Sequence, residues 1–285
     1  MASTETNRFP LHGWIGLSLI AVFWTLNWTL NGLRTHLLFF PLWLGYALSV
    51  DGLVYRRKGN SLLTRSRKQY ILLFVISIPA WWLFELINLR THNWLYLGRE
   101  RFSDLEYVLL SSLSFSTVMP AVFGTAEWVA DFDWVKRLKK GPAYGRTPGE
   151  VRTLFIWGWL MLAALLLWPR YCFPFVWMSV CFILDPLNVW FGKRSLIGYV
   201  RRGDWRPVMA LWVGCLICGF FWEMWNFYAY PKWVYEVPFV DFLHVFEMPI
   251  LGFLGYLPFS LELFCIYHLL MPSKDCMVLP DVDRD

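Results

Sequence analysis

The sequence predicts an all-α, polytopic integral membrane protein with about eight transmembrane helices in two tandem, parallel four-helix repeats. Hydrophobic residues make up 57% of the 285-residue chain and charged residues only 16%, whereas soluble domains carry roughly 25% charged residues. Several apolar stretches reach about 18 residues or more, and about 20 helical residues cross the hydrocarbon core of a bilayer. In addition, one motif occurs twice, as Phe84-Glu85-Leu86-Ile87-Asn88 and as Trp222-Glu223-Met224-Trp225-Asn226.

The expected spans are the apolar runs between loops that contain charged residues, glycine or proline. Ten-residue segments of alternating polarity, which mark membrane β-barrels, are absent, so we expect helices. The first run begins near Trp14 without a small-residue cleavage site after it, so we expect it to be retained as a span. The last run is long enough to be tilted or to begin as an interfacial segment. The eight spans are residues 14–32, 37–55, 70–89, 105–128, 153–169, 173–191, 207–228 and 243–270.

The distribution of basic residues predicts the orientation. If the N-terminus is cytoplasmic, the cytoplasmic loops hold 20 of the 26 Lys and Arg residues and the opposite loops hold six. Because cytoplasmic loops are enriched in Lys and Arg, we expect both termini in the cytoplasm, in a bacterial inner membrane. The same loops account for the net charge of +5, since basic residues beside a span interact with anionic lipid headgroups. We therefore expect membrane lipids, and not nucleic acid, as partners.

The two halves of the chain carry the same features in the same order, which predicts an internal duplication. Four spans per half is an even number, so both halves enter the membrane in the same direction and form a parallel repeat. We expect repeats at residues 1–135 and 153–285, the second with a short C-terminal tail, joined by a basic cytoplasmic linker at 136–152. The corresponding features are Phe40-Pro41 and Phe173-Pro174, Asp51 and Asp185, the two Glu-x-x-Asn motifs, and the Trp-x-Tyr pairs Trp94-x-Tyr96 and Trp233-x-Tyr235.

Glu85 and Glu223 are the candidate catalytic residues. Glu85 lies 15 residues after Tyr70 and Glu223 lies 15 residues after Val208, near the starts of their spans, which corresponds to about 22 Å of helical rise and places both in the outer third of the bilayer. A carboxyl group at that depth can hold a proton at neutral pH and deliver it as a general acid. Asn88 and Asn226 follow three residues later on the same helix face and would orient the carboxyl groups. The alternative is structural, with each Glu bonding a neighbouring helix and each Asn capping its own helix.

The tryptophans near these motifs are candidate substrate-binding residues. Trp81 and Trp82 precede Glu85, and an aromatic lining beside a buried acid suits an apolar or cationic ligand. A packed aromatic core is the alternative interpretation. The candidate substrate-binding residues are Trp82, Trp94, Trp222, Trp225 and Trp233.

Two further acidic sets have simpler explanations. Asp241, His244 and Glu247, matched in the first half by a set that includes Glu106, offer oxygen and nitrogen ligands for a divalent cation. Their spacing is not a metal signature, and we interpret them as solvated interfacial residues, leaving a cation site open. Asp51 and Asp185 precede basic loops, and capping or pairing explains them.

Stretches such as residues 39–46 and 81–88 resemble those of an uncharacterised family of bacterial multipass membrane proteins, which implies a polytopic helical fold. The duplicated helical units, with one acid in each half and abundant aromatic residues, are more loosely similar to integral-membrane terpene and lycopene cyclases. In those enzymes embedded carboxylates protonate an alkene or epoxide and aromatic residues stabilise the carbocation. This likeness implies that role for Glu85 and Glu223.

Three functions remain open on the sequence alone. The first is a membrane enzyme that acts on a lipidic or isoprenoid substrate, a hydrophobic small molecule, by carboxylic-acid catalysis. The second is a proton- or ion-coupled transporter with its site between the repeats. The third is a membrane scaffold without a small-molecule ligand. The sequence does not identify a substrate, a cofactor or an oligomeric state.

Overall fold

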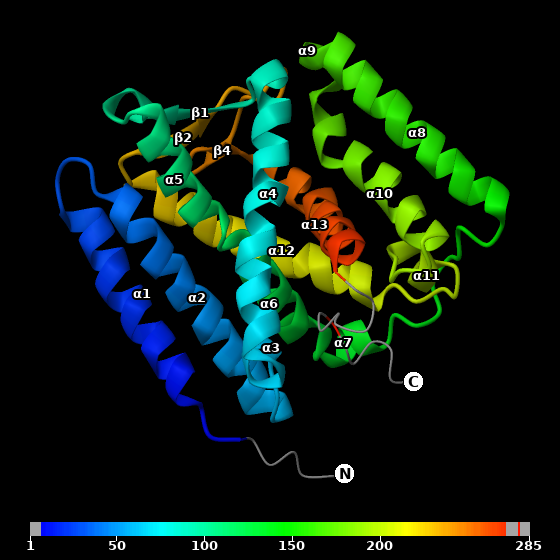
Figure 1. Ribbon diagram of the computed structural model, residues 1–285, viewed down its shortest axis with the longest axis horizontal. Helices are drawn as coiled ribbons and strands as arrows, with labels where there is room; N and C mark the ends of the chain where they lie inside the picture. Colours follow the sequence, from blue (N-terminus) through cyan, green and yellow to red (C-terminus); the bar gives the residue numbers. More distant parts are fainter. Residues whose placement is uncertain (1–6, 272–278, 280–285) are drawn as a thin grey trace.

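The fold is a bundle of helices with two short antiparallel strand pairs at one end (Figure 1). The computed structural model describes residues 7–271 and Leu279; the termini and most of the predicted C-terminal tail lie outside this part of the chain. The helices are α1 (Leu11–Thr29), α2 (Thr35–Lys58), α3 (Leu62–Arg65), α4 (Arg67–Thr91), α5 (Asp104–Phe115), α6 (Val118–Ala130), α7 (Asp133–Lys136), α8 (Pro148–Leu167), α9 (Pro169–Cys172), α10 (Ser179–Trp190), α11 (Leu196–Val200), α12 (Arg206–Phe227) and α13 (Tyr256–Leu270). The strands are β1 (Trp94–Leu97), β2 (Lys232–Tyr235), β3 (His244–Val245) and β4 (Met248–Pro249), and 3-10 helices cover Arg99–Arg101, Phe173–Trp177 and Ile250–Gly255.

Helices long and apolar enough to cross a membrane dominate the described chain, as expected for a multipass membrane protein. There are seven, and the first expected span, α1, is not among them, so the total of eight stays a prediction. The seven are Thr35–Lys58, Arg67–Thr91, Asp104–Ala130, Pro148–Leu167, Pro169–Trp190, Arg206–Phe227 and Ile250–Leu270.

Three of the expected spans are interrupted near prolines. A proline inside a helix clashes with the carbonyl group four residues earlier. Pro120 accordingly follows the break between α5 and α6, since the residue four positions before it is Ser116. Pro174 lies in the 3-10 segment before α10, and Pro258 follows the 3-10 segment before α13. The expected span 243–270 is therefore helical only from Ile250 onward, and the β3–β4 hairpin precedes it.

Small residues allow α1 and α2 to pack closely along their length. A Cβ atom on Gly45 would lie 2.8 Å from the Gly16 carbonyl oxygen, and one on Gly16 would lie 2.6 Å from the Ser49 amide nitrogen. Membrane helices associate through such small-residue contacts, because close approach of the backbones increases van der Waals contact.

Gly45→Val is therefore expected to separate α1 from α2 and to lower the free energy of unfolding by about 1–3 kcal/mol, the usual range for overpacking. Chemical denaturation in detergent micelles measures the change. Gly149→Ala is the matched control, because its new Cβ would meet only the Thr147 hydroxyl oxygen, at 3.8 Å. Equal losses in the two variants would contradict this account of the helix contact.

The interior of the bundle is formed around α6. Nearly all of α6 is buried, because it lies against α2, α4 and α12. In contrast, α8 lies at the edge of the bundle and exposes large apolar side chains such as Trp157 and Leu160 (Figure 1). In a bilayer this face of α8 would contact lipid.

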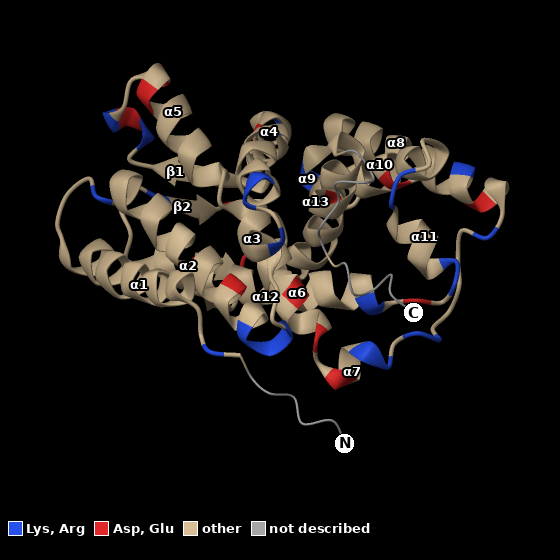
Figure 2. Ribbon diagram, turned by 60° about the horizontal axis from the view of Figure 1, so that its bottom comes forward, with Lys and Arg blue, Asp and Glu red and all other residues tan. Residues whose placement is uncertain are grey.

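Basic loops surround the short helices α3, α7 and α11 (Figure 2). Buried aspartates fix two of these short helices. Asp51 accepts a hydrogen bond from the Leu63 amide at the start of α3 (3.0 Å), and Asp185 accepts one from the Ile197 amide at the start of α11 (2.7 Å). Free amides at a helix N-terminus favour a nearby carboxylate, so of the two expected explanations, capping accounts for both contacts.

Candidate functional site

Glu85 of α4 lies within a set of aromatic hydrogen-bond donors. Its Oε1 atom accepts hydrogen bonds from the indole nitrogens of Trp81 (2.9 Å) and Trp94 (3.0 Å) and from the hydroxyl group of Tyr96 (2.5 Å). An indole N–H can only donate, so two of the three contacts fix this oxygen as an acceptor. Three donors on one oxygen stabilise the ionised carboxylate.

Glu223 of α12 has a similar environment in the second half of the chain. Its side chain is fully buried, and its Oε1 atom accepts hydrogen bonds from the hydroxyl groups of Tyr235 (2.7 Å) and Tyr256 (2.6 Å). Its buried Oε2 atom has no hydrogen-bond partner among the described residues. The tyrosine of the Trp-x-Tyr motif thus donates to the glutamate of its own half in both cases.

The asparagines of the two motifs bind the main chain. The Asn88 amide group donates to the Trp94 carbonyl oxygen (2.8 Å), and the Asn226 amide group donates to the Trp233 carbonyl oxygen (2.7 Å). The Asn226 side-chain oxygen also accepts from the Trp233 amide at 3.0 Å. The sequence predicts that the asparagines orient the carboxyl groups. Their side chains hold the strands that carry three of the five aromatic donors, Trp94, Tyr96 and Tyr235, so any such orientation acts through the strands.

Strands β1 and β2 join the two halves of the chain. They pair antiparallel, with Trp94 opposite Tyr235 and Tyr96 opposite Trp233, so the register is centred on Leu95 and Val234. Each tryptophan of one Trp-x-Tyr motif therefore lies opposite the tyrosine of the other. This pairing brings together the donors that lie on the strands, Trp94 and Tyr96 of Glu85 and Tyr235 of Glu223.

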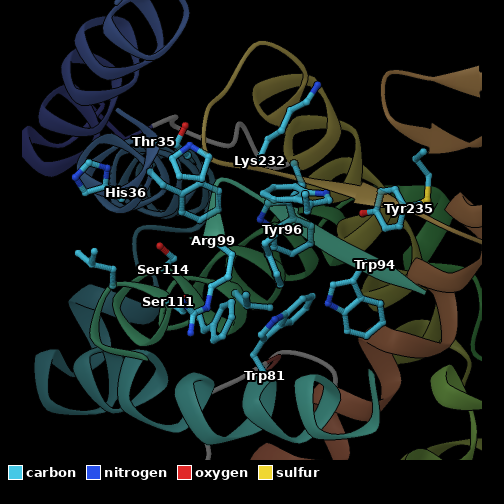
Figure 3. A pocket seen from close by; sticks show the side chains of 18 of the residues that line it. Thr35, His36, Trp81, Trp94, Tyr96, Arg99, Ser111, Ser114, Lys232 and Tyr235 are labelled. Atoms are coloured by element: carbon cyan, nitrogen blue, oxygen red, sulfur yellow. The ribbon is translucent and has the colours of Figure 1, made fainter. Parts of the chain in front are cut away.

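A partly open cavity of about 190 Å³ lies beside this strand pair (Figure 3). The five aromatic donors of the two glutamates all line it, whereas the carboxyl groups lie behind the donors and are not part of the lining. About half of the lining residues are aromatic, namely Phe39, Trp81, Trp94, Tyr96, Phe102, Tyr107, Phe115, Trp177, Trp222, Trp233, Tyr235, Tyr256 and Phe259. Such an apolar cavity with a few convergent polar groups is the usual form of a small-molecule site.

Three of the five candidate substrate-binding tryptophans line this cavity: Trp94, Trp222 and Trp233. The other two do not. Trp82 faces α5, where its indole nitrogen donates to the Ser112 hydroxyl group at 2.9 Å. Trp225 is buried against α1 and α2, where it packs on Trp24 and Trp43. We therefore leave Trp82 and Trp225 out of the candidate site.

Several lining residues lie outside the five predicted substrate-binding tryptophans. Tyr96 and Tyr235 belong to the Trp-x-Tyr motif, so the repeat itself could have indicated them. Trp81 precedes Glu85 by four residues, the spacing that places two side chains on one helix face. Tyr256 lies 33 residues after Glu223, and no local pattern connects the two.

The lining also contains polar and charged side chains, namely Thr35, His36, Arg99, Ser111, Ser114 and Lys232. Figure 3 shows Thr35 and His36 on the side of the cavity opposite Trp94 and Tyr235. The two cationic lining residues have acidic partners, since Arg99 pairs with Asp104 and Lys232 pairs with Glu247.

The strand tyrosines are fixed as proton donors. Burial, followed by the proximity of Glu85, raises the pKa of Tyr96 well above its ordinary value. Burial and the proximity of Glu223 do the same to the pKa of Tyr235. Both hydroxyl groups therefore stay protonated across the physiological pH range. A hydroxyl group between a carboxylate and a cavity can relay a proton between them.

The acidic set at the strand end of the bundle is engaged in local contacts. The His244 ring bonds Asp241 at 2.8 Å, Glu247 pairs with Lys232, and Glu106 caps α5 through Ser103. Within residues 7–271, no group of three or more His, Cys, Asp and Glu side chains is arranged to hold a metal ion.

No family model, curated protein or solved structure matches the chain. The proposal of function therefore rests on the geometry of the site.

Proposed function

We propose that this protein is a membrane enzyme that binds a lipidic or isoprenoid molecule in the aromatic cavity and acts on it by acid–base catalysis. One observation carries the proposal: the aromatic donors of two glutamates, 138 residues apart in the chain, line a single apolar cavity. If each glutamate had only a structural role, the hydrogen-bond donors of Glu85 and those of Glu223 would not need to line the same cavity.

Each carboxylate–tyrosine pair can move a proton without forming a free tyrosinate. A substrate proton passes to the Tyr96 oxygen as the Tyr96 hydroxyl proton passes to Glu85, and the reverse sequence returns a proton. Tyr235 and Glu223 provide the same route on the other side of the strand pair. One pair then serves as the acid and the other as the base. Such transfers contribute typically 10²–10⁴-fold to a rate.

The proposal includes an internal duplication, with repeats at residues 1–135 and 153–285. Matching contacts in the two halves support it. In both, the asparagine of the Glu-x-x-Asn motif binds the main chain of the Trp-x-Tyr tryptophan, and the motif tyrosine donates to the glutamate. The likeness to membrane terpene and lycopene cyclases is part of the same proposal, supported by aromatic rings beside two acids.

A proton- or ion-coupled transporter is the second candidate. Interrupted helices at corresponding positions of two halves are a feature of transporter sites. The break between α5 and α6 and the 3-10 segment before α13 are such a pair, and both segments contribute to the cavity lining. Proton-dependent uptake by vesicles that contain the purified protein would favour this candidate over the enzyme.

Mass spectrometry of lipids that co-purify with the protein tests the proposal. The wild-type protein is expected to retain a lipid-like molecule that Ser114→Trp loses, because the larger side chain would fill the cavity. Trp82→Phe is the control, since Trp82 lies outside the lining. Identical lipid content in the wild type and Ser114→Trp would refute a ligand in this cavity and would favour a scaffold.

A further inference from the structure

The side of the cavity next to Glu85 and Glu223 has the electrostatic character of a cation site. The indole and hydroxyl groups of the lining donate their protons backward to the two carboxylates, so the hydroxyl oxygens are left to face the cavity as acceptors. Aromatic faces are themselves negative and attract cations. The carboxylate of the pair that serves as the base, together with many ring faces, therefore favours positive charge in this part of the cavity.

The cations already present do not cancel this preference. Arg99 is bound by Asp104 and also lies over the ring of Tyr107, with its guanidinium carbon 4.2 Å from the centroid. Lys232 is bound by Glu247. His36 is the remaining basic residue of the lining, and it lies on the opposite side from Trp94 and Tyr235 (Figure 3). Arg99 and Lys232 thus each already have a carboxylate partner of their own.

The same geometry distinguishes among cations. A primary ammonium group brings three N–H donors. Beside Trp94 the lining offers it the hydroxyl oxygens of Tyr235 and Tyr256, while the carboxylate oxygens lie behind the lining, so at least one N–H donor would lack a partner. A buried donor without a partner is costly. A quaternary ammonium group has no N–H donor, and aromatic cages bind such groups through their ring faces.

We propose that the ligand of this cavity carries a quaternary ammonium head, held beside Trp81, Trp94, Tyr235 and Tyr256. The inference deepens the proposed function, on which it rests, by naming the chemical class of the ligand at the same site. An amphiphile of this kind would place its cationic head among the rings and an apolar chain along the rest of the lining.

Choline, its neutral isostere 3,3-dimethylbutan-1-ol, and ethanolamine test the inference by titration calorimetry in a non-ionic detergent. The first two differ only by carbon in place of the charged nitrogen, and ethanolamine has the primary ammonium group. Choline is expected to bind the wild-type protein at least tenfold more tightly than either. The double variant Glu85→Gln and Glu223→Gln is expected to lose at least tenfold of this preference, and Trp82→Phe to retain it.

Each other outcome has a defined meaning. Equal binding of choline and 3,3-dimethylbutan-1-ol by the wild type would overturn the inference that the ligand is a cation. The proposed function would still hold, with an uncharged apolar ligand in the cavity. Failure of all three probes would also overturn it. The proposed function fails separately, if no lipid co-purifies in a cavity-dependent manner. Because the wild-type comparison decides the inference, it does not depend on folding of the double variant.

Discussion

Glu223→Gln is expected to abolish turnover of the bound molecule while leaving the protein folded. Gln has the shape of Glu and can still accept hydrogen bonds from Tyr235 and Tyr256, but it cannot take up or release the proton. We expect a rate loss of about 10²–10⁴-fold, the typical contribution of a positioned acid or base. Glu85→Gln is expected to act in the same way, since Glu85 occupies the corresponding position.

The measurement is the mass of the lipid that co-purifies with each variant. An inactive variant retains unreacted substrate, so its bound molecule should differ in mass from the mixture in the wild type. Glu262→Gln is the matched control, because Glu262 is a fully buried glutamate of a spanning segment that does not line the cavity. Identical bound molecules in the wild type and both Glu→Gln variants of the site would contradict catalysis by these carboxylates.

Glu127→Gln is expected to produce the largest loss of stability, about 3–5 kcal/mol, the usual cost of breaking a buried ion pair. Glu127 of α6 is 1% exposed, and its two oxygens accept hydrogen bonds from Arg65 at 2.7 and 2.6 Å. The pair connects α6 to α3, which lies beside α4. The substitution leaves the Arg65 charge without its carboxylate in a largely buried position.

Chemical denaturation in detergent measures this loss. The control is Arg57→Gln, which removes a more exposed pair with Asp131 and is expected to cost less than about 1 kcal/mol. Replacing both Arg65 and Glu127 by Met is expected to be less harmful than Glu127→Gln alone, because no uncompensated charge remains. A Glu127→Gln loss no larger than that of Arg57→Gln would show that the buried pair does not stabilise α6.

Much of the fold could be predicted from the sequence because the bilayer sets the length of an apolar helix. The breaks in three spans could not be placed from hydropathy, although Pro120, Pro174 and Pro258 mark them, because proline is also tolerated inside helices. Pro41 and Pro79 lie within unbroken α2 and α4. The presence of a proline in an apolar run therefore does not show whether the helix is broken there or continues.

The candidate site was predictable only in part. The repeated motif identified Glu85 and Glu223, but their partners depend on contacts between elements far apart in sequence. Trp81 and Trp82 are adjacent in the chain, yet one lines the cavity and the other bonds Ser112 of α5. The asparagines lie in the last turn of their helices, just before the chain enters the strand. Their side chains therefore hydrogen-bond the main chain of the strand and not the glutamates.

The meeting of the two halves at β1 and β2 is the central claim, and disulfide formation between paired cysteines tests it most directly. Leu95 and Val234 are opposite each other in the strand pair, and paired strand residues have Cα atoms about 4.5–5.5 Å apart, within reach of a disulfide. Leu95→Cys with Val234→Cys is expected to cross-link within one chain under mild oxidation, and Leu95→Cys with Glu236→Cys is not. Cross-linking only between molecules, or equal cross-linking of the two pairs, would mean that the two glutamates do not share a cavity through this strand pair.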